Sequence, residues 1–224
     1  MNYIKIFIEF IVGTIKSQSI CRIYQLNNFK KIFFKGKALE FGEDELKRSF
    51  LQFSNLKKKD IFFSNNFNSK KNNYIRINLE KRNKTKKIFN NIVILNVLEH
   101  VYDTNNAILE IRKLLKKNGN LIISTPFLYR YHGAPDDYNR YTMSYLEKIL
   151  KLNKFKLIKK INCGTGPFLA GYSLIFDYIK RIPILPVPIL ILSLMLDKLL
   201  SLFQKTKMSS LYPICIFIIA KKIH

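Results

Sequence analysis

Cysteine is scarce in this chain, and its placement excludes several classes of protein. The 224 residues include 3 cysteines, Cys21, Cys163 and Cys215, which stand far apart and in no metal-ligand spacing. They exclude a disulfide framework and a cysteine-based zinc site, and they favour a reducing compartment such as the cytoplasm. The sequence predicts no metal site.

Acidic residues are also few, and arginine is a small part of the basic excess. Lysine and arginine together number 39 against 15 acidic residues, which gives a formal net charge of +24. Such a charge suits nucleic-acid binding. Only 8 of the basic residues are arginine, however, and the lysines are scattered. Because base recognition favours the bidentate guanidinium, we expect no specific nucleic-acid partner. A general compositional bias and an anionic membrane surface remain as explanations of the lysine excess.

The chain has no apolar run that is long enough to span a bilayer. Residues 182–196 carry no charge, but they include three prolines and fall short of the roughly 20 residues that a spanning helix needs. Residues 167–204 therefore form an apolar insertion, which either packs on the domain or dips into a bilayer interface, and we favour the interface. Glu9 interrupts the apolar N-terminal stretch and no small-residue cleavage site follows, so no secretory signal is predicted.

Short apolar runs alternate with helical periodicity along the chain. Isoleucine and valine recur at helical spacing in residues 3–17, which predicts an amphipathic helix that packs on the domain or lies on a membrane surface. Residues 1–35 would be a lead-in to a domain of residues 36–224. Strands are expected at 37–42, 60–63, 74–79, 92–96, 121–125, 155–161 and 212–221, and further helices at 44–56, 103–117 and 142–152. This alternation predicts an α/β fold with a doubly wound, mostly parallel sheet and a helical apolar insertion before the last strand.

The middle of the chain reads as a strand, a crossover helix and a second strand. A short β-branched run ends at Leu95, Asp103 can cap the following helix, and Asn118-Gly119 supplies a left-handed stop. In open α/β sheets, ligands bind at the carboxyl ends of such strands. Glu99 and His100 would lie there.

These residues resemble the centre of a known family. Asn96-Val97-Leu98-Glu99-His100, with its flanking strand and helix, resembles class I S-adenosylmethionine-dependent methyltransferases, and Glu40-Phe41-Gly42 is similar to the start of their glycine-rich motif. The resemblance covers residues 36–162 and the final strand. It implies a Rossmann-like fold and S-adenosylmethionine as cofactor. The later glycines of the motif are absent, because residues 43–45 are all acidic.

The resemblance also implies which residues contact the cofactor. The backbone at Gly42 would approach it, the Asp60 carboxylate would take the ribose hydroxyls, and Asn78 would lie beside the adenine. The full set of implied cofactor-binding residues is Glu40, Gly42, Asp60, Asn78, Leu79 and Asn96.

Residues 126–142 leave the fifth expected strand at the same edge of the sheet. This segment is similar to a methyltransferase subgroup associated with cell-surface glycan or lipid-linked sugar genes. It carries one histidine, two aspartates, four tyrosines and two arginines, which suits binding of a polar substrate. His132 can remove a hydroxyl proton near neutral pH, with Asp136 as the second catalytic residue, or it is a solvated loop histidine.

Three further side chains are assigned to the substrate. They are His100, Tyr138 and Arg140. Two of them have a structural alternative: His100 fits a residue that orders the loop by hydrogen bonding, and Arg140 fits an ion pair with Asp137.

The sequence thus predicts an S-adenosylmethionine-dependent methyltransferase that acts on oxygen of a glycan, lipid-linked or other small hydroxylated substrate. We expect it in the cytoplasm, with peripheral contact at the inner face of the cell membrane. One rival is a scaffold protein that keeps the fold and has lost cofactor binding through residues 43–45. The other is a methyltransferase that binds nucleic acid, which would need a concentrated basic face.

Overall fold

The structure is a computed structural model that describes residues 3–43, 45–64, 73–133 and 136–223. Backbone contacts divide the chain into two compact units. The first unit comprises residues 1–28, 126–131 and 162–216, and the second comprises residues 29–125, 132–161 and 217–224.

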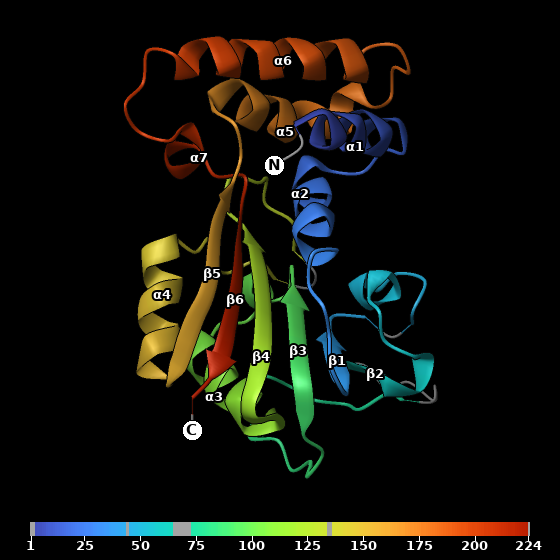
Figure 1. The fold of residues 1–224 in the computed structure, drawn as a ribbon, viewed down its shortest axis with the longest axis vertical. Helices are drawn as coiled ribbons and strands as arrows, with labels where there is room; N and C mark the ends of the chain where they lie inside the picture. Colours follow the sequence, from blue (N-terminus) through green and yellow to red (C-terminus); the bar gives the residue numbers. More distant parts are fainter. Residues whose placement is uncertain (1–2, 44, 65–72, 134–135, 224) are drawn as a thin grey trace. The chain divides into compact units, whose positions relative to one another are not determined.

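Most of a six-stranded sheet lies in the second unit (Figure 1). The strand order is β2-β1-β3-β4-β6-β5. β1 pairs in parallel with β2 and β3, and β3 pairs in parallel with β4, whereas Figure 1 shows β6 running against its neighbours. The predicted α/β fold with a mostly parallel sheet is therefore confirmed. The strands are β1 (Ala38–Phe41), β2 (Ile61–Ser64), β3 (Phe89–Leu95), β4 (Leu115–Pro126), β5 (Phe155–Cys163) and β6 (Cys215–Lys222).

The centre of the sheet forms the core of the second unit. Ile92, Val93 and Ile94 of β3 are all fully buried, as expected of a strand that is covered on both faces. Two helices of this unit begin where the sequence predicts. Asp103 accepts a hydrogen bond from the Asn106 amide at the start of α3 (Thr104–Leu114), and Thr142 caps α4 (Met143–Leu152) in the same way.

The end of α3 differs from the prediction. The helix ends at Leu114 rather than at Asn118-Gly119, although Asn118 does adopt a left-handed conformation with φ of 62°. The Lys222 ammonium donates to the carbonyls of Arg112 and Leu115 at 2.8 and 2.7 Å, so the last carbonyls find a partner in a distant strand. Leu115 can then leave the helix and pair with Phe89 of β3.

The predicted helix over residues 44–56 is wrong. Within the described part of this segment the structure has only a short 3₁₀ turn, η1 (Phe50–Phe53). The reason is the buried carboxylate of Glu40 in β1, which accepts hydrogen bonds from the Ser49 hydroxyl at 2.5 Å and from the amides of Phe50 and Leu51 at 2.9 and 3.1 Å. An α-helix would need those two amides for its own carbonyls. A side chain outside the segment therefore decides its conformation.

The predicted strand over residues 74–79 is also wrong. Its one ladder contact is a bridge between Tyr74 and Phe63 at the outer edge of β2. The chain then leaves the sheet, and Ile77 and Leu79 are buried without being part of a strand. The alternating apolar residues of this segment thus indicate burial and not pairing in a sheet.

The first unit is helical. It contains α1 (Tyr3–Ile15), α2 (Ile20–Phe29, which reaches one residue into the second unit), α5 (Pro167–Ile179), α6 (Pro186–Ser201) and α7 (Met208–Leu211). Both α1 and α5 pack against α6, so the N-terminal helix and the apolar insertion belong to one body. The predicted helices at residues 3–17 and within 167–204 are confirmed, whereas α2 was not predicted.

Asp197 of α6 connects α6 to the start of α5. The Asp197 side chain is buried and accepts hydrogen bonds from the Thr165 hydroxyl at 2.6 Å and from the amides of Phe168 and Leu169 at 2.9 and 3.1 Å. Amides in the first turn of a helix have no partner within the helix, so this carboxylate supplies one from another element. Asp197, which directly follows the uncharged run of residues 182–196, is therefore a helix cap.

The face of α1 that the periodicity predicts to be buried is exposed. α1 instead packs through Phe10, whose ring meets Tyr24 of α2 edge-on at 5.0 Å, and through Gly13. The first unit consequently presents many large apolar side chains to solvent. They are Phe7, Ile8, Val12, Ile15, Tyr131, Phe168, Leu174, Ile175, Tyr178, Ile182, Ile184, Leu185, Leu192, Met195, Leu199, Leu202, Phe203, Leu211 and Tyr212.

None of the helices in the described residues combines the length and the apolar character that crossing a membrane requires. The three cysteines are buried free thiols.

The buried Glu40 carboxyl should make stability depend on pH. Burial raises its pKa from 4.5 to about 7, against the opposing hydrogen bonds from Ser49, Phe50 and Leu51 and with a smaller contribution from Glu43. Below the ordinary pKa both states hold the proton; above it the unfolded chain ionises while the folded chain resists. The contribution to stability is therefore lost as pH rises to about 7.

We expect the free energy of unfolding of the unaltered protein to fall between about pH 5 and pH 8. In Glu40→Gln this fall should be smaller, by up to about 3 kcal/mol. Urea unfolding at both pH values measures the difference. Some slope remains in the variant, because burial raises the pKa of Glu99 in the same direction. Identical pH dependence in both proteins would contradict this account of Glu40.

Replacing Asp197 should destabilise the first unit. Asp197→Ala leaves the Thr165 hydroxyl and two amides without their acceptor, and we expect a loss of about 2–4 kcal/mol by denaturant unfolding. Asp177→Ala is the matched control, since it removes the same charge from a partly exposed position paired with Arg130 and Lys180. The control should cost less than about 1 kcal/mol. Equal losses in the two variants would show that Asp197 is not a structural cap.

Candidate functional site

The carboxyl ends of β1 and β3 meet at one edge of the sheet. Their parallel register places Phe41 opposite Ile94, so the turns that follow both strands are neighbours. Gly42 has φ of +93°, and a Cβ atom built on it would lie 2.7 Å from a methyl carbon of Val97. Asn96 also lies in the left-handed region, with φ of 56°, and its amide donates to the Ser124 carbonyl at 2.9 Å. Both strands thus end in tight turns that bring exposed backbone to this edge.

The turn over residues 78–80 lies beside the same edge. Its Glu80 carboxylate accepts from the Tyr102 amide at 2.9 Å, and the Leu79 carbonyl accepts from the Asn106 side chain at 3.0 Å. The Asn78 side chain holds the turn itself, because its oxygen accepts from the Glu80 amide at 2.8 Å. The structure therefore brings the two residues assigned to the adenine to the start of α3, which follows β3 and η3, although the region was wrongly expected to be a strand.

Asp60 does not join this group. It ends the 3₁₀ turn η2 (Lys58–Asp60) and precedes β2, so it lies at the amino end of a strand that runs parallel to β1. Gly42 lies at the other edge of the sheet. The assignment of the ribose hydroxyls to Asp60 is therefore not compatible with this placement, because a strand of four residues separates Asp60 from the carboxyl edge. Residues 65–72, which follow the carboxyl end of β2, lie outside the described residues.

Glu40 acts on the architecture of the site rather than facing a ligand. Its three hydrogen bonds all go to Ser49, Phe50 and Leu51. The carboxylate is buried and holds the segment that follows the Gly42 turn. Glu40 was predicted to contact the cofactor; in the structure it instead positions the segment after the turn.

Glu99 is the most unusual side chain at the edge. It belongs to the short 3₁₀ turn η3 (Leu98–His100) that follows β3. Its side chain is 0% exposed, and within the described residues neither carboxylate oxygen has a hydrogen-bond partner. Burial raises its pKa from 4.5 to about 8, although the nearby Arg140 opposes the shift. Buried carboxyl groups are normally hydrogen-bonded, so this one is a candidate to bind something that the protein itself does not supply.

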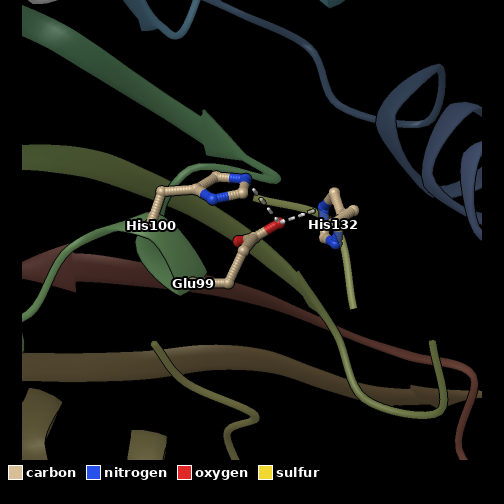
Figure 2. Close-up of side chains that lie close together, drawn as sticks. All are labelled: Glu99, His100 and His132. Atoms are coloured by element: carbon tan, nitrogen blue, oxygen red, sulfur yellow. Dashed lines mark ion pairs between the residues drawn. The ribbon is translucent and has the colours of Figure 1, made fainter. Parts of the chain in front are cut away.

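Two imidazoles face this carboxylate (Figure 2). The Nε2 atoms of His100 and His132 each lie 4.0 Å from the same oxygen of Glu99, and the two rings meet edge-on with centroids 5.0 Å apart. His100 comes from η3 and His132 from the segment that follows β4, so the fold brings together residues that are 32 positions apart in sequence.

The other nitrogen of each imidazole lies close to an oxygen of the loop that follows β4. The Nδ1 atom of His100 lies 2.5 Å from the main-chain oxygen of Asp136, and the Nδ1 atom of His132 lies 3.1 Å from the carboxylate of Asp137. Asp137 also accepts the His132 amide at 2.9 Å and forms a two-pronged ion pair with Arg140. These bonds, with Arg140 foremost, hold the pKa of Asp137 well below its usual range.

The structure revises two roles assigned from sequence. Asp136 gives its carbonyl to His100, while its side chain accepts from the Tyr138 hydroxyl at 3.0 Å. The aspartate that contacts His132 is Asp137. Arg140 is engaged in the ion pair with Asp137, which was the structural alternative to substrate binding.

The loop that carries these residues is tied to η3 by its backbone. The amides of Tyr138 and Asn139 both donate to the Glu99 carbonyl, at 2.8 and 3.2 Å. The Tyr141 hydroxyl donates to the Leu98 carbonyl at 2.8 Å and pairs with Thr104 at 2.6 Å. This network places Glu99 at the centre of the site, and reasoning from sequence gave it no assigned role. The available signal was a carboxylate directly after a strand that is buried on both faces.

Residues at the edge also fit a polar ligand such as S-adenosylmethionine. The hydroxyls of Ser64, at the end of β2, and Thr125, at the end of β4, are buried without a hydrogen-bond partner among the described residues. Together with Glu99, which follows β3, they place polar atoms without a hydrogen-bond partner in the described part of the chain at the carboxyl ends of three of the four parallel strands. Gly42 leaves the backbone there uncovered.

Comparison with solved structures identifies the fold. The chain has a TM-score of 0.55 to an S-adenosylmethionine-dependent methyltransferase from Mesorhizobium loti, at 10% identity over 90% of this chain and 98% of the other. It has a TM-score of 0.52 to phosphoethanolamine N-methyltransferase 2 of Haemonchus contortus in complex with S-adenosyl-L-methionine, at 15% identity over 89% of this chain and 51% of that one. The [4+2]-cyclase SpnF gives 0.54, at 11% identity over 89% and 80%. No protein-family model and no curated protein matches the sequence.

The chain therefore has the class I methyltransferase fold, as the resemblance predicts. At these identities the likeness shows the fold alone. The presence of a cyclase among proteins of this fold shows that activity has to be argued from the site.

Proposed function

We propose that this protein is an S-adenosylmethionine-dependent methyltransferase that binds its cofactor at the carboxyl edge of the sheet and methylates oxygen of a small hydroxylated, glycan or lipid-linked substrate. The observation that carries the proposal is the Gly42 turn, an exposed left-handed glycine at the end of β1 that meets Val97 after β3. Open α/β folds bind their ligands at this edge, where a glycine lets the backbone approach the ligand closely.

S-adenosylmethionine supplies a methyl group on a sulfonium: the acceptor oxygen forms the new carbon–oxygen bond, the sulfur–methyl bond breaks, and the hydroxyl proton is released. The protein holds and orients the two reactants. In our proposal Gly42 and Asn96 approach the cofactor, with the turn over residues 78–80 beside the adenine. Glu99, with the two imidazoles that face it, meets the acceptor.

The rival is a scaffold protein with this fold that no longer binds the cofactor. Its basis is the acidic residues Glu43 and Glu45, which follow Gly42 where the family would carry glycines. Their negative charges would repel the carboxylate of the cofactor. The unpaired buried groups of Ser64, Glu99 and Thr125 favour the enzyme, because a scaffold has no need for polar atoms that are buried without partners. Calorimetric titration of the full chain with S-adenosylhomocysteine separates the two, since the rival predicts no heat of binding.

Gly42 offers a substitution that tests where the cofactor binds. In Gly42→Ala the added methyl would stand 2.7 Å from Val97 at a φ that L-residues rarely adopt, so the turn has to change its conformation. We expect affinity for S-adenosylhomocysteine to fall about tenfold or more in a calorimetric titration.

Gly171→Ala is the matched control, because its methyl would meet nothing within 4 Å inside α5. Its affinity should equal that of the unaltered protein, and thermal melting of both variants confirms that each is folded. Unchanged affinity in Gly42→Ala would place the cofactor away from this turn and remove the main support for the proposal.

We further propose peripheral binding to an anionic membrane surface through the first unit. Its exposed apolar side chains are accompanied by exposed basic residues, and this pairing suits insertion beside acidic headgroups. The exposed basic residues are Lys16, Arg130, Lys180, Arg181, Lys198, Lys205 and Lys207. A lipid-linked substrate would be met at such a surface.

Liposome flotation tests the membrane proposal. The unaltered protein should float with vesicles rich in phosphatidylserine and not with phosphatidylcholine alone. A variant in which the highly exposed Ile184, Leu202 and Phe203 are changed to serine should not float. These changes leave the helix cap Asp197 unaltered. A control with Phe33, Leu152 and Ile158 of the second unit changed to serine should still float. The proposal fails if the unaltered protein stays at the bottom of the gradient or if both triple variants behave alike.

A further inference from the structure

Glu99, His100 and His132 have the geometry of a metal site. The ligand atoms of all three lie within 4.8 Å of one another, and Figure 2 shows both imidazoles turned toward the carboxylate. Nitrogen and oxygen ligands around zinc, at about 2.0–2.1 Å from the ion, stand roughly 3.3 Å apart. An ion at this point would therefore need to draw the ligand atoms together by up to about 1.5 Å. His132 lies on a partly exposed loop and Glu99 on a short 3₁₀ turn, so neither is fixed by a long helix or strand.

The groups behind the imidazoles are those that support metal-binding histidines. Such histidines almost always donate their second ring nitrogen to a carbonyl or a carboxylate, which fixes the tautomer and points the first nitrogen at the ion. Here Nδ1 of His100 lies at hydrogen-bond distance from the Asp136 carbonyl oxygen, and Nδ1 of His132 lies at ion-pair distance, 3.1 Å, from the Asp137 carboxylate. Both Nε2 atoms consequently face Glu99.

The carboxylate itself supplies an independent observation. Glu99 is 0% exposed, and within the described part of the chain neither of its oxygens has a hydrogen-bond partner. A buried carboxylate without a partner is costly, whereas a carboxylate that coordinates a cation is satisfied.

We infer that Glu99, His100 and His132 bind a divalent transition-metal ion such as Zn²⁺, Mn²⁺ or Fe²⁺. Two imidazoles and one carboxylate suit these ions, whereas Mg²⁺ and Ca²⁺ prefer oxygen ligands throughout. The site arises from one turn after β3 and one loop after β4, which explains why ligand spacing along the sequence did not reveal it.

Three protein ligands leave coordination positions for an oxygen of a bound molecule. Because the site lies at the carboxyl edge, a hydroxyl of the methyl acceptor could fill such a position, and its proton would be lost more readily there. This use of the ion rests on the proposed function. The binding of the ion does not.

Metal titration of the full chain tests the inference. The protein is purified without a histidine tag, treated with a chelator, and titrated with Co²⁺ and Zn²⁺. We expect one equivalent of Co²⁺ to give the visible absorption of a protein-bound ion, Zn²⁺ to displace it, and Mg²⁺ at the same concentration to have no effect. Bound Zn²⁺ should also raise the melting temperature.

Three variants assign the ion to the site. Glu99→Gln and His132→Asn each remove a ligand at nearly constant volume, and Asp137→Asn weakens the group that holds His132; each should lower Zn²⁺ affinity by about 10–100-fold or more. Asp136→Asn is the matched control, since it changes the adjacent side chain and keeps the carbonyl that His100 uses. Its affinity should be unchanged.

Absence of Co²⁺ absorption and of Zn²⁺ binding in the unaltered protein would overturn the inference, and so would equal affinity in Glu99→Gln. Titration of the same protein with S-adenosylhomocysteine keeps the two proposals apart. Zn²⁺ binding that depends on Glu99 supports the metal site even if the cofactor analogue does not bind, and cofactor binding without Zn²⁺ binding overturns the metal site alone.

Discussion

Parallel pairing of β1, β3 and β4 is the constraint on which the site depends. Strands that run in the same direction end at the same edge, and the register sets Phe41 opposite Ile94 and Ile94 opposite Ile123. The groups at the carboxyl ends of these strands are therefore brought to one edge of the sheet: the Gly42 turn, η3 with Glu99, and Thr125. The apolar, fully buried middle of β3 stabilises this pairing through the hydrophobic effect, so the chemistry at the edge is supported by the core.

The edge concentrates polar groups that the rest of the fold would not tolerate. Glu99 is buried there without a hydrogen-bond partner among the described residues, and the Nε2 atoms of two adjacent imidazoles each lie 4.0 Å from the same carboxylate oxygen. Asp137 and Arg140 form a separate ion pair that orders the loop behind His132. Stability is thus reduced at one point of the fold in order to keep a reactive arrangement, as is common at functional sites.

The sequence predicted those features that depend on local chemistry. The caps of α3 and α4 are side-chain bonds to amides three residues away, and the buried strand β3 is a short β-branched run, so both can be recognised from neighbouring residues. The helix over residues 44–56 failed because the buried carboxylate of Glu40 takes the amides it would need. The strand over residues 74–79 failed because only Tyr74 pairs with the edge of the sheet.

The site was predicted in part, for the same reason. Gly42, Asn96, His100 and His132 were named from motifs, and the structure brings them to one edge. The importance of Glu99 depends on its burial and on a histidine 33 residues away, neither of which a local pattern reports. Asp60 was assigned to the ribose although the expected strand already begins at this residue, so the order along the chain alone puts it at the amino end.

Hydrogen–deuterium exchange with and without S-adenosylhomocysteine tests the central claim most directly. The account predicts slower exchange in peptides that follow β1 and β3, around Gly42 and Asn96–His100, and no change in the peptide that carries Asp60 at the opposite edge. Slower exchange confined to that opposite edge, or none anywhere at saturating ligand, would contradict a cofactor site at the carboxyl ends of the strands.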